Sequence, residues 1–526
     1  MTVETTAGTT VQSTSEETHR RARLARLGVH ARGVGALTLA AAAVYALLGL
    51  VRLSTFRATT FDLVIVDQAV RAYAKFAPPY IPTVGMVHGR GMEYLQVADH
   101  FSPIYALLAP LYWIHDGPAS LIVGQALLFA GAIPFLWMYT RRVLGTAPAY
   151  LVSAAYALSW PVAQAVNFDA HEVMFVPILS AIMIERFHAG KRLPAALAMA
   201  GLLFVKEDMG LMVIGAGACL FLLGHRWIGL GCAALGAGWA VMLRGWLMPL
   251  LGGDIQDFWA YAHFGPDVKS TVWAMVSDPL GTLGVLFDTE TKVDTMFLLV
   301  WPTLLLCLLS PMVLMAVPLV LERMLADRSL WWAQDYQYNA FVIVVLICAG
   351  VDGLARLLRL VGRPDDRRVG LAWAAAALAV AITLLPQFAF GQLVRPEFYR
   401  KDIRALAAAE VVSKVPSGVV VETVNSLGPA LTRRATVLMW GNRPYGSPWV
   451  VADVARWEYP FGSLDEQRDR VNDLVRSGYR PVFERDGFVV LHRPSAATAG
   501  PTPPTPSTPS TFPTPPAPSA PPAPSG

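Results

Sequence analysis

Apolar runs long enough to cross a lipid bilayer recur along this chain from about residue 34 to residue 389. A helix needs about 20 consecutive apolar residues to span the hydrocarbon core. The 526 residues are 54% hydrophobic and 15% charged, whereas a soluble domain carries about 25% charge. A single globular core stops growing beyond about 250 to 300 residues, so the surplus apolar residues must face lipid. We therefore predict a polytopic α-helical membrane protein rather than a soluble enzyme.

The basic residues orient the predicted spans, because lysine and arginine concentrate in short cytoplasmic loops. The segment 1–33 is rich in arginine and is predicted to be a cytoplasmic N-terminus. Later basic clusters, such as Arg141 with Arg142, also fall inside if the chain has about 11 spans. The predicted spans are 34–52, 119–139, 147–166, 173–188, 193–205, 209–223, 227–248, 295–309, 311–321, 340–357 and 369–387. Two of them, 193–205 and 311–321, are short enough to fuse with a neighbour, which leaves nine spans as the alternative.

This topology places three large segments outside the cytoplasm, and the membrane domain 34–389 carries the first two as its loops 53–118 and 249–294. The third, 390–494, is predicted to be a small extracytoplasmic α/β domain. Its expected elements are a helix over 402–414, strands over 418–423 and 436–440, a helix over 464–477, and a final hairpin turning at Arg485, Asp486 and Gly487. The remaining residues, 495–526, are mainly proline, threonine and serine, a composition that cannot bury enough surface to fold. We predict that this tail is disordered.

Composition also argues against some functions. The net charge of +4 is small, and no basic surface interleaved with aromatic residues suggests nucleic acid as a partner. The four cysteines, Cys219, Cys232, Cys307 and Cys348, all lie within apolar runs. They are not spaced for a zinc site or a disulfide framework, and we interpret them as packing residues.

Most acidic and histidine residues near span ends fall on the predicted outer side of the membrane. Ionisable groups at membrane depth are costly and usually mark a functional site or a loop. The groups concerned are Asp62 with Asp67, Asp99 with His100, Asp169 with His171 and Glu172, Lys206 with Glu207 and Asp208, and the segment 335–338. Several segments that are far apart in the sequence thus meet one membrane face, which predicts one outward-facing polar site.

In the first external loop, Asp62 and Asp67 have different predicted roles. On a helix over 61–77 they are about 140° apart, so they cannot both face one small site. Asp67 has Arg71 four residues later, which favours a structural ion pair. Asp62 can cap the start of the helix, or it can act as a base on a substrate carried by lipid.

The other clusters also allow two interpretations. Asp99 with His100 fits a helix start, or contact of His100 with phosphate or a metal, and Asp169 with Glu172 fits a capping box. The two histidines and the carboxylates are residue types that bind a divalent cation, but no tight ligand spacing supports one, so a cation remains an open alternative. Lys206 lies either in a plain turn or beside a lipid phosphate. Tyr338 belongs either to an aromatic belt at the interface or to a sugar site.

These segments also carry a family resemblance, which extends from about residue 45 to residue 493. The resemblance rests on Phe61-Asp62-Leu63 with Asp67-Gln68, on Asp99-His100-Phe101-Ser102-Pro103, on the run from Phe168 to Glu172, and on Lys206-Glu207-Asp208. In this order they resemble a bacterial predicted-membrane-protein family of unknown function, which is similar in layout to the GT-C superfamily of polytopic glycosyltransferases. The sequence departs from the family pattern at Gln337, where a histidine is expected.

The resemblance implies a transferase that takes a sugar from a polyprenyl-phosphate donor and passes it to an acceptor outside the cell membrane. It implies an essential acidic residue in the first external loop, which maps to Asp62 as the base. Residues expected at the substrate or its phosphate are His100, Lys206, His171, Glu172, Asp99 and Tyr338. The alternatives are a membrane transporter or lipid flippase, whose polar residues would line a path through both membrane halves, and a noncatalytic envelope assembly protein.

Overall fold

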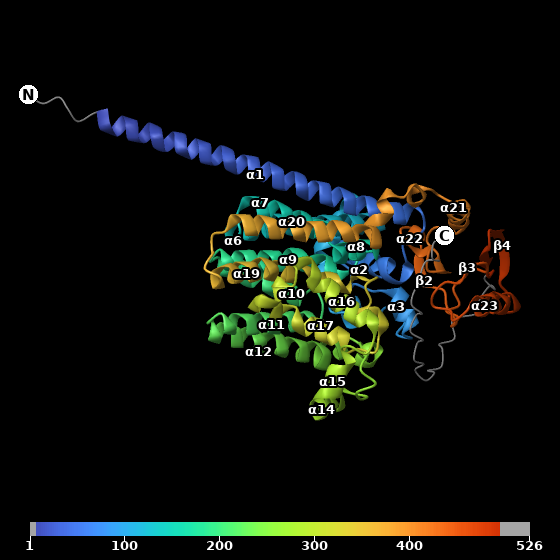
Figure 1. Ribbon diagram of the computed structural model, residues 1–526. Helices are drawn as coiled ribbons and strands as arrows, with labels where there is room; N and C mark the ends of the chain where they lie inside the picture. Colours follow the sequence, from blue (N-terminus) through green and yellow to red (C-terminus); the bar gives the residue numbers. More distant parts are fainter. Residues whose placement is uncertain (1–6, 495–526) are drawn as a thin grey trace, which may run out of the picture.

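The structure is a computed structural model that describes the backbone of residues 7–494 and the side chains of residues 28–494 other than residue 255. The predicted disordered tail 495–526 lies outside the described residues. Helices make up most of the chain, and a five-stranded sheet follows near its C-terminal end. Figure 1 shows the start of the first helix and this sheet at opposite ends of a helical bundle.

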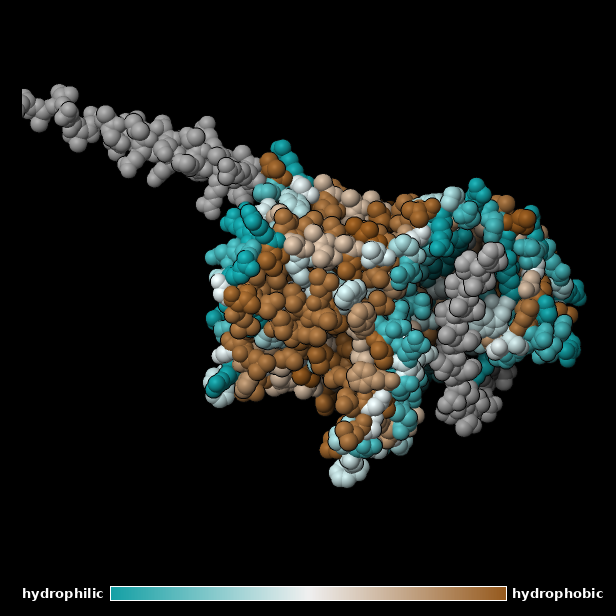
Figure 2. All heavy atoms as spheres, in the orientation of Figure 1, coloured by the Kyte–Doolittle hydropathy of each residue, from teal (hydrophilic) through white to brown (hydrophobic). Residues whose placement is uncertain are grey.

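The bundle is built from the apolar segments. Its helices are α1 (Ala7–Ser54), α6 (Pro118–Val143), α7 (Thr146–Ala157), α8 (Trp160–Asn167), α9 (Val176–His188), α10 (Arg192–Leu203), α11 (Met209–Leu222), α12 (Arg226–Met242), α13 (Met248–Leu250), α16 (Glu290–Val300), α17 (Val317–Met324), α18 (Ser329–Trp332), α19 (Ile343–Leu360) and α20 (Arg367–Leu384). Among the described residues, four helical stretches are long and apolar enough to cross a membrane, namely Gly28–Ser54, Pro118–Val143, Arg226–Leu250 and Arg367–Gln387. Figure 2 shows a hydrophobic band over the bundle.

Several predicted spans are interrupted, so the count of eleven is not confirmed. The predicted span 147–166 consists of α7 and α8, which are separated at Leu158 and Ser159. In place of 295–309, α16 ends at Val300 and is followed by short 3₁₀ turns, and 311–321 begins with the 3₁₀ turn Pro311–Met315. Proline lacks a backbone donor and breaks a helix interior, which accounts for breaks beside Pro161, Pro302 and Pro311.

Two helices near the site pack backbone to backbone. A Cβ atom added to Gly210 of α11 would lie 2.6 Å from the carbonyl oxygen of Gly236 in α12, and one added to Gly229 would lie 2.5 Å from that of Gly217. Only glycine permits this approach. The close pairing sets the segment that follows α12, with Arg244, beside the start of α11 at Asp208.

The C-terminal sheet has the strand order β2-β1-β3-β5-β4. Its strands are β1 (Val420–Thr423), β2 (Thr436–Met439), β3 (Trp449–Asp453), β4 (Arg480–Arg485) and β5 (Phe488–His492). Strand β1 is parallel to β2 and β3, whereas β5 is antiparallel to β3 and β4. The helices around it are α21 (Ile403–Lys414), α22 (Gly428–Leu431) and α23 (Leu464–Arg476).

The predicted final hairpin is confirmed, because Asp486 and Gly487 both have positive φ, 49° and 82°, as a tight two-residue turn requires. The predicted helices and the first two strands are also confirmed within a few residues. Strand β3 was not predicted, since its five residues have no clear alternation and no tight turn joins them to another strand.

The loop 53–118, which is predicted to be external, joins the bundle to the sheet. It contains a π-helical turn over Thr60–Val64, helices α2 (Ile65–Ala74), α3 (Pro82–Val87), α4 (Gln96–Asp99) and α5 (Ala109–Ile114), and the 3₁₀ turn Pro103–Leu108. Val64 is part of the hydrophobic core beneath the sheet, and the Gln68 amide donates to the carbonyl oxygen of Val437 in β2 at 2.9 Å. The loop 249–294 carries two further helices, α14 (Val268–Ser277) and α15 (Pro279–Val285).

Asp67 has the structural role that its spacing predicts. Its carboxylate is fully buried and accepts hydrogen bonds from Arg71 at 2.8 Å, Tyr112 at 2.6 Å and Thr432 at 2.7 Å. Because Thr432 follows α22, these bonds tie the external loop to the C-terminal region. They hold in place the segment that carries Asp62.

We expect Asp67→Asn to destabilise the protein, because it removes the buried partner of Arg71 and leaves only the half-exposed Asp116. The cost should approach that of a broken buried pair, which is about 3–5 kcal/mol. Asp116→Asn is the matched control, since Asp116 also pairs with Arg71 but its side chain is 44% exposed. It should change stability by less than about 1 kcal/mol. Thermal unfolding of both purified variants measures the difference, and equal melting temperatures would contradict the assignment.

Candidate functional site

A cavity of about 510 Å³ lies where the external loop, the bundle and the C-terminal region meet. All the residues that the sequence placed at the substrate line it: Asp62, Asp99, His100, His171, Glu172, Lys206 and Tyr338. They come from five segments of the chain, namely Asp62, Asp99 with His100, His171 with Glu172, Lys206, and Tyr338. The structure therefore brings these side chains together around one cavity, as the sequence predicts. Their chemical roles remain proposals.

Asp62 lies in the π-helical turn and faces His171 across the cavity wall. Its Oδ1 atom is 3.0 Å from Nε2 of His171, and the Thr59 hydroxyl lies 3.3 Å from its Oδ2 atom. The Asp62 side chain keeps 22% of its surface exposed. His171 is buried and stacks on the ring of Phe168. The result is a carboxylate that is oriented by an imidazole yet still accessible from the cavity.

The predicted capping roles in these segments are wrong. Thr59, not Asp62, is the residue before the π-helical turn, and no side chain caps that turn. The Asp169 carboxylate accepts hydrogen bonds from the backbone N–H and the hydroxyl of Thr59, both at 2.7 Å, instead of capping the turn at Glu172. Asp169 thus fastens the residues just before Asp62.

Glu172 and Lys206 form a buried ion pair deeper in the site. The Lys206 Nζ atom is 3.0 Å from Oε1 of Glu172, and the Tyr105 hydroxyl donates to Oε2 at 3.1 Å. The Lys206 ammonium also lies 6.0 Å from the ring centres of Tyr338 and Phe341. Burial alone would raise the pKa of Glu172, but the nearby Lys206 charge outweighs it and lowers the pKa to about 2.

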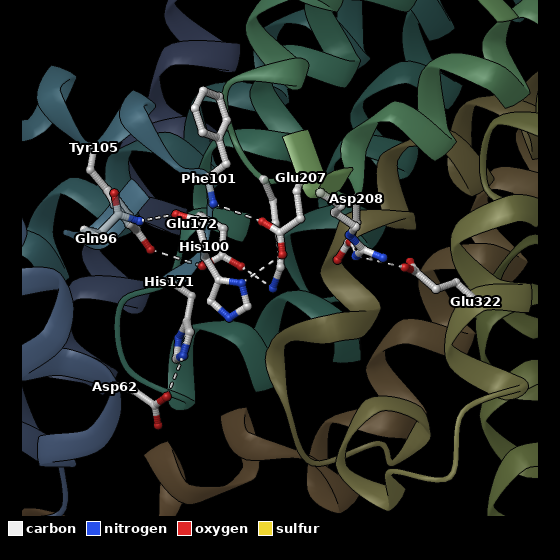
Figure 3. A network of polar contacts seen from close by, with 12 residues as sticks. Asp62, Gln96, His100, Phe101, Tyr105, His171, Glu172, Glu207, Asp208 and Glu322 are labelled. Atoms are coloured by element: carbon white, nitrogen blue, oxygen red, sulfur yellow. Dashed lines mark hydrogen bonds and ion pairs between the residues drawn. The ribbon is translucent and has the colours of Figure 1, made fainter. Parts of the chain in front are cut away.

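His100 forms a second pair, with Glu207. The His100 Nδ1 atom is 2.9 Å from Oε1 of Glu207, whose Oε2 accepts from the backbone N–H of Phe101 at 3.0 Å. Burial and Lys206 lower the pKa of His100, but Glu207 and Asp99 outweigh them and raise it. Figure 3 shows this pair in the middle of the network, between the Asp62–His171 pair and the Asp208–Glu322 end. The segment 206–208 is thus more than a turn.

Asp99 lies at one side of the cavity with atoms that lack partners. Burial raises the pKa of its carboxyl group, and His88 Nδ1 is 3.8 Å from Oδ1, too far for a hydrogen bond. Among the described residues, no partner bonds Asp99 Oδ1, Gln96 Oε1, His171 Nδ1 or Gln337 Oε1. Buried polar atoms in proteins are nearly always satisfied, so these atoms favour a polar ligand or water in the cavity.

Other lining residues were not predicted from the sequence: His88, Arg244, Asp257, Glu322, Arg323, Arg328, Asn425 and Tyr459. Arg244 pairs with Asp208 and lies 3.5 Å from Glu322. An arginine inside the apolar run 227–248 is itself a signal of function. This signal is sufficient to include Arg244 among the candidate site residues. Asn425 and Tyr459 belong to the C-terminal region, and only the folded chain brings them to the cavity.

The open alternative of a divalent cation gains no support from the geometry. Within residues 28–494, no three histidine, cysteine or carboxylate side chains are grouped so that they could hold a metal ion. His100 and His171 each face a carboxylate in a separate pair. Such pairs suit proton transfer and charge compensation.

The pairing of His171 with Asp62 predicts a dependence of stability on pH. Burial lowers the pKa of His171, but the Asp62 carboxylate outweighs it and raises the pKa. A raised histidine pKa contributes stability below about pH 6.5 and loses it as pH rises through the folded-state value. Asp62→Asn should therefore lower the melting temperature more at about pH 6 than at about pH 9. Equal differences at the two pH values would contradict a charged pair.

Comparisons with known proteins agree with the membrane character of the chain. A family model described as a predicted membrane protein, DUF2079, matches residues 52–490. Two crystal structures of ArnT from Cupriavidus metallidurans are similar over 90% of this chain and 100% of that chain. The one bound to undecaprenyl phosphate has 14% identity and a TM-score of 0.48, and the apo form has 13% and 0.45. No curated protein matches the chain.

Proposed function

The chain belongs to the DUF2079 family of predicted membrane proteins, and we propose that it is a glycosyltransferase acting at the membrane surface. In this proposal it moves a sugar from a polyprenyl-phosphate donor to an acceptor outside the cytoplasm. The observation that carries the proposal is the partly exposed Asp62 carboxylate, held by His171 at the wall of a cavity that also contains several cationic groups.

The proposed reaction needs one base and one place for a phosphate. Asp62 takes the proton from the acceptor hydroxyl, whose oxygen attacks the anomeric carbon of the sugar. The bond between this carbon and the phosphate oxygen breaks, and the polyprenyl phosphate leaves as an anion. Such a leaving group needs charge neutralisation more than a proton. Lys206 and His100 lie beside the phosphate, while His171 and Glu172 position their partners.

The position of the polar cavity at one end of the bundle supports an enzyme over a carrier. The cavity lies at the end of the bundle next to the sheet, while loops such as those between α6 and α7 and between α19 and α20 lie at the other end (Figure 1). Arginines gather at this distant end, including Arg141 and Arg142 in the last turn of α6 and Arg363 between α19 and α20. A carrier would need polar side chains along a path through both halves.

The same distribution predicts the orientation in the cell membrane. By the positive-inside rule, the arginine-rich end faces the cytoplasm, and the cavity with the C-terminal region faces outward. A phosphatase reporter, which is active only outside the cytoplasm, should be active when fused after residue 494. A β-galactosidase fusion at the same point should be inactive, and the reverse pattern would overturn the orientation.

The function is best tested by following the lipid-linked donor, since this requires no knowledge of the sugar or the acceptor. Cells that lack the gene should accumulate a polyprenyl-phosphate sugar and lose one component of the envelope glycan, and the wild-type gene should restore both. Mass spectrometry of lipid extracts and glycan analysis measure the two effects. Unchanged lipids and glycans in the deletion strain would count against a transferase.

A further inference from the structure

The cationic groups of the cavity differ in whether a carboxylate already compensates them. Lys206 is paired with Glu172, and His100 with Glu207. Arg244 is paired with Asp208 and lies close to Glu322. An incoming anion would have to compete with the carboxylate for each of these cations. A phosphate group would therefore bind more weakly to these cations than to a cation without a carboxylate partner.

Arg328 is a cavity-lining cation of this second kind. It forms no ion pair with any residue that the structure describes, and its Nη2 atom donates to the backbone carbonyl oxygen of Asp257 at 2.9 Å. The guanidinium carbon lies 5.5 Å from the ring centre of Trp331 and 5.9 Å from that of Phe258. The two rings also line the cavity. They hold the guanidinium in place by cation–π contact without neutralising it.

Arg323 adds positive charge nearby, at the end of α17. It is buried and lines the cavity. Its Nη1 atom donates to the Asn339 side-chain oxygen at 3.2 Å, and its Nε atom to the carbonyl oxygen of Leu319 at 3.3 Å. Its Nη2 atom is buried without a hydrogen-bond partner among the described residues. A buried donor of this kind is costly unless a ligand satisfies it.

Arg328 also lies on the same part of the cavity as the proposed base. The hydroxyl groups of Tyr338 and Tyr459 each interact electrostatically with both Asp62 and Arg328. Tyr459 packs edge-on against Phe61, the neighbour of Asp62. Both tyrosine hydroxyls are therefore near a carboxylate that can accept a proton and near a guanidinium that can bind an anion.

We propose that Arg328, with Arg323 behind it, binds the phosphate group of the lipid-linked substrate. The inference rests on the proposed function and adds a residue to it. A sugar phosphodiester carries one negative charge, which a single uncompensated guanidinium matches. The planar fork of arginine donates two parallel hydrogen bonds to phosphate oxygens, which lysine cannot do. Lys206 and Glu172 then act as a neutral pair that shapes the wall beside the phosphate.

The test measures binding, so it does not depend on knowing the sugar. Purified full-length protein in lipid nanodiscs is titrated with a polyprenyl monophosphate, and with the corresponding polyprenol as the uncharged probe. Wild type should bind the phosphate at least about tenfold more tightly than the alcohol, and Arg328→Gln should lose this preference. Arg328→Lys keeps the charge and should lose about three- to fivefold. Arg57→Gln is the matched control, because Arg57 also donates to a backbone carbonyl, that of Phe398, and lies over the Phe398 ring, but it does not line the cavity.

The outcomes separate the inference from the proposed function. If wild type prefers the phosphate and Arg328→Gln retains this preference in a folded state, the assignment of Arg328 is wrong while the transferase proposal stands. If wild type binds the alcohol as tightly as the phosphate, recognition of a polyprenyl-phosphate donor is itself wrong. Inorganic phosphate at the same concentration should not displace the lipid, and full displacement would overturn a lipid headgroup as the ligand. If Arg328→Gln fails to fold, Arg328→Lys decides, and unchanged binding would contradict the proposed fork.

Discussion

The Asp62→Asn variant is expected to transfer sugar about 10²- to 10⁴-fold more slowly than the wild type, which is the usual contribution of a general base. Asparagine keeps the size and the hydrogen-bonding oxygen of the side chain but cannot take up a proton. His171 Nε2 can still donate to that oxygen, as it lies 3.0 Å from Oδ1 in the wild type. The substrate should therefore bind almost as before, and the loss should fall on the chemical step.

The measurement is complementation of the deletion strain, followed by lipid and glycan analysis, with the amount of each variant in the membrane determined in parallel. Asp116→Asn removes a carboxylate from the same external loop but outside the cavity lining, and it should restore full activity. A donor sugar that accumulates with Asp62→Asn and not with Asp116→Asn supports the assignment. Normal glycans with a well-expressed Asp62→Asn variant would remove Asp62 as the base.

The gathering of the site could be predicted because membrane insertion sorts charges by side. Asp62, His100, His171 and Lys206 lie at the ends of apolar runs that all reach the same membrane face. This sorting restricts where they can meet, even though it says nothing about distances. Asp67 could be separated from them by its angle on the helix and by Arg71 one turn later, and both its burial and its pairing agree with that.

The partners within the site could not be predicted in the same way. Whether Lys206 faces a lipid phosphate or Glu172 depends on how deep in the membrane the segments with Lys206 and Glu172 lie. The hydropathy of the sequence does not determine this depth. Arg323 and Arg328 follow an apolar run, a position that is typical of ordinary interfacial arginines. Only the structure shows that they line the cavity. The span count is not confirmed for a related reason, since prolines divide apolar runs into helices shorter than hydropathy alone suggests.

The second large effect is expected for Lys206→Met, which should lower both the stability and the activity of the protein. The side chains of Lys206 and Glu172 are only 10% and 6% exposed, so removing the ammonium leaves a buried carboxylate without its cation, at a cost of about 3–5 kcal/mol. Because the pKa of Glu172 is lowered to about 2, the pair contributes stability above the usual glutamate range and loses it only as pH falls toward that value. Thermal unfolding near neutral pH therefore reports the full contribution of the pair.

The double variant Lys206→Met with Glu172→Gln separates structure from function. Glutamine keeps an oxygen for the Tyr105 hydroxyl, which donates to Glu172 in the wild type, and neither charge remains to be compensated. Replacing both members of a buried pair is often neutral, so the double variant should unfold near the wild-type temperature. The two single changes should be strongly non-additive. If the pair only shapes the wall of the phosphate site, the double variant recovers most of the activity. A stable double variant that is as inactive as Lys206→Met would instead show that the Lys206 charge itself acts on the substrate.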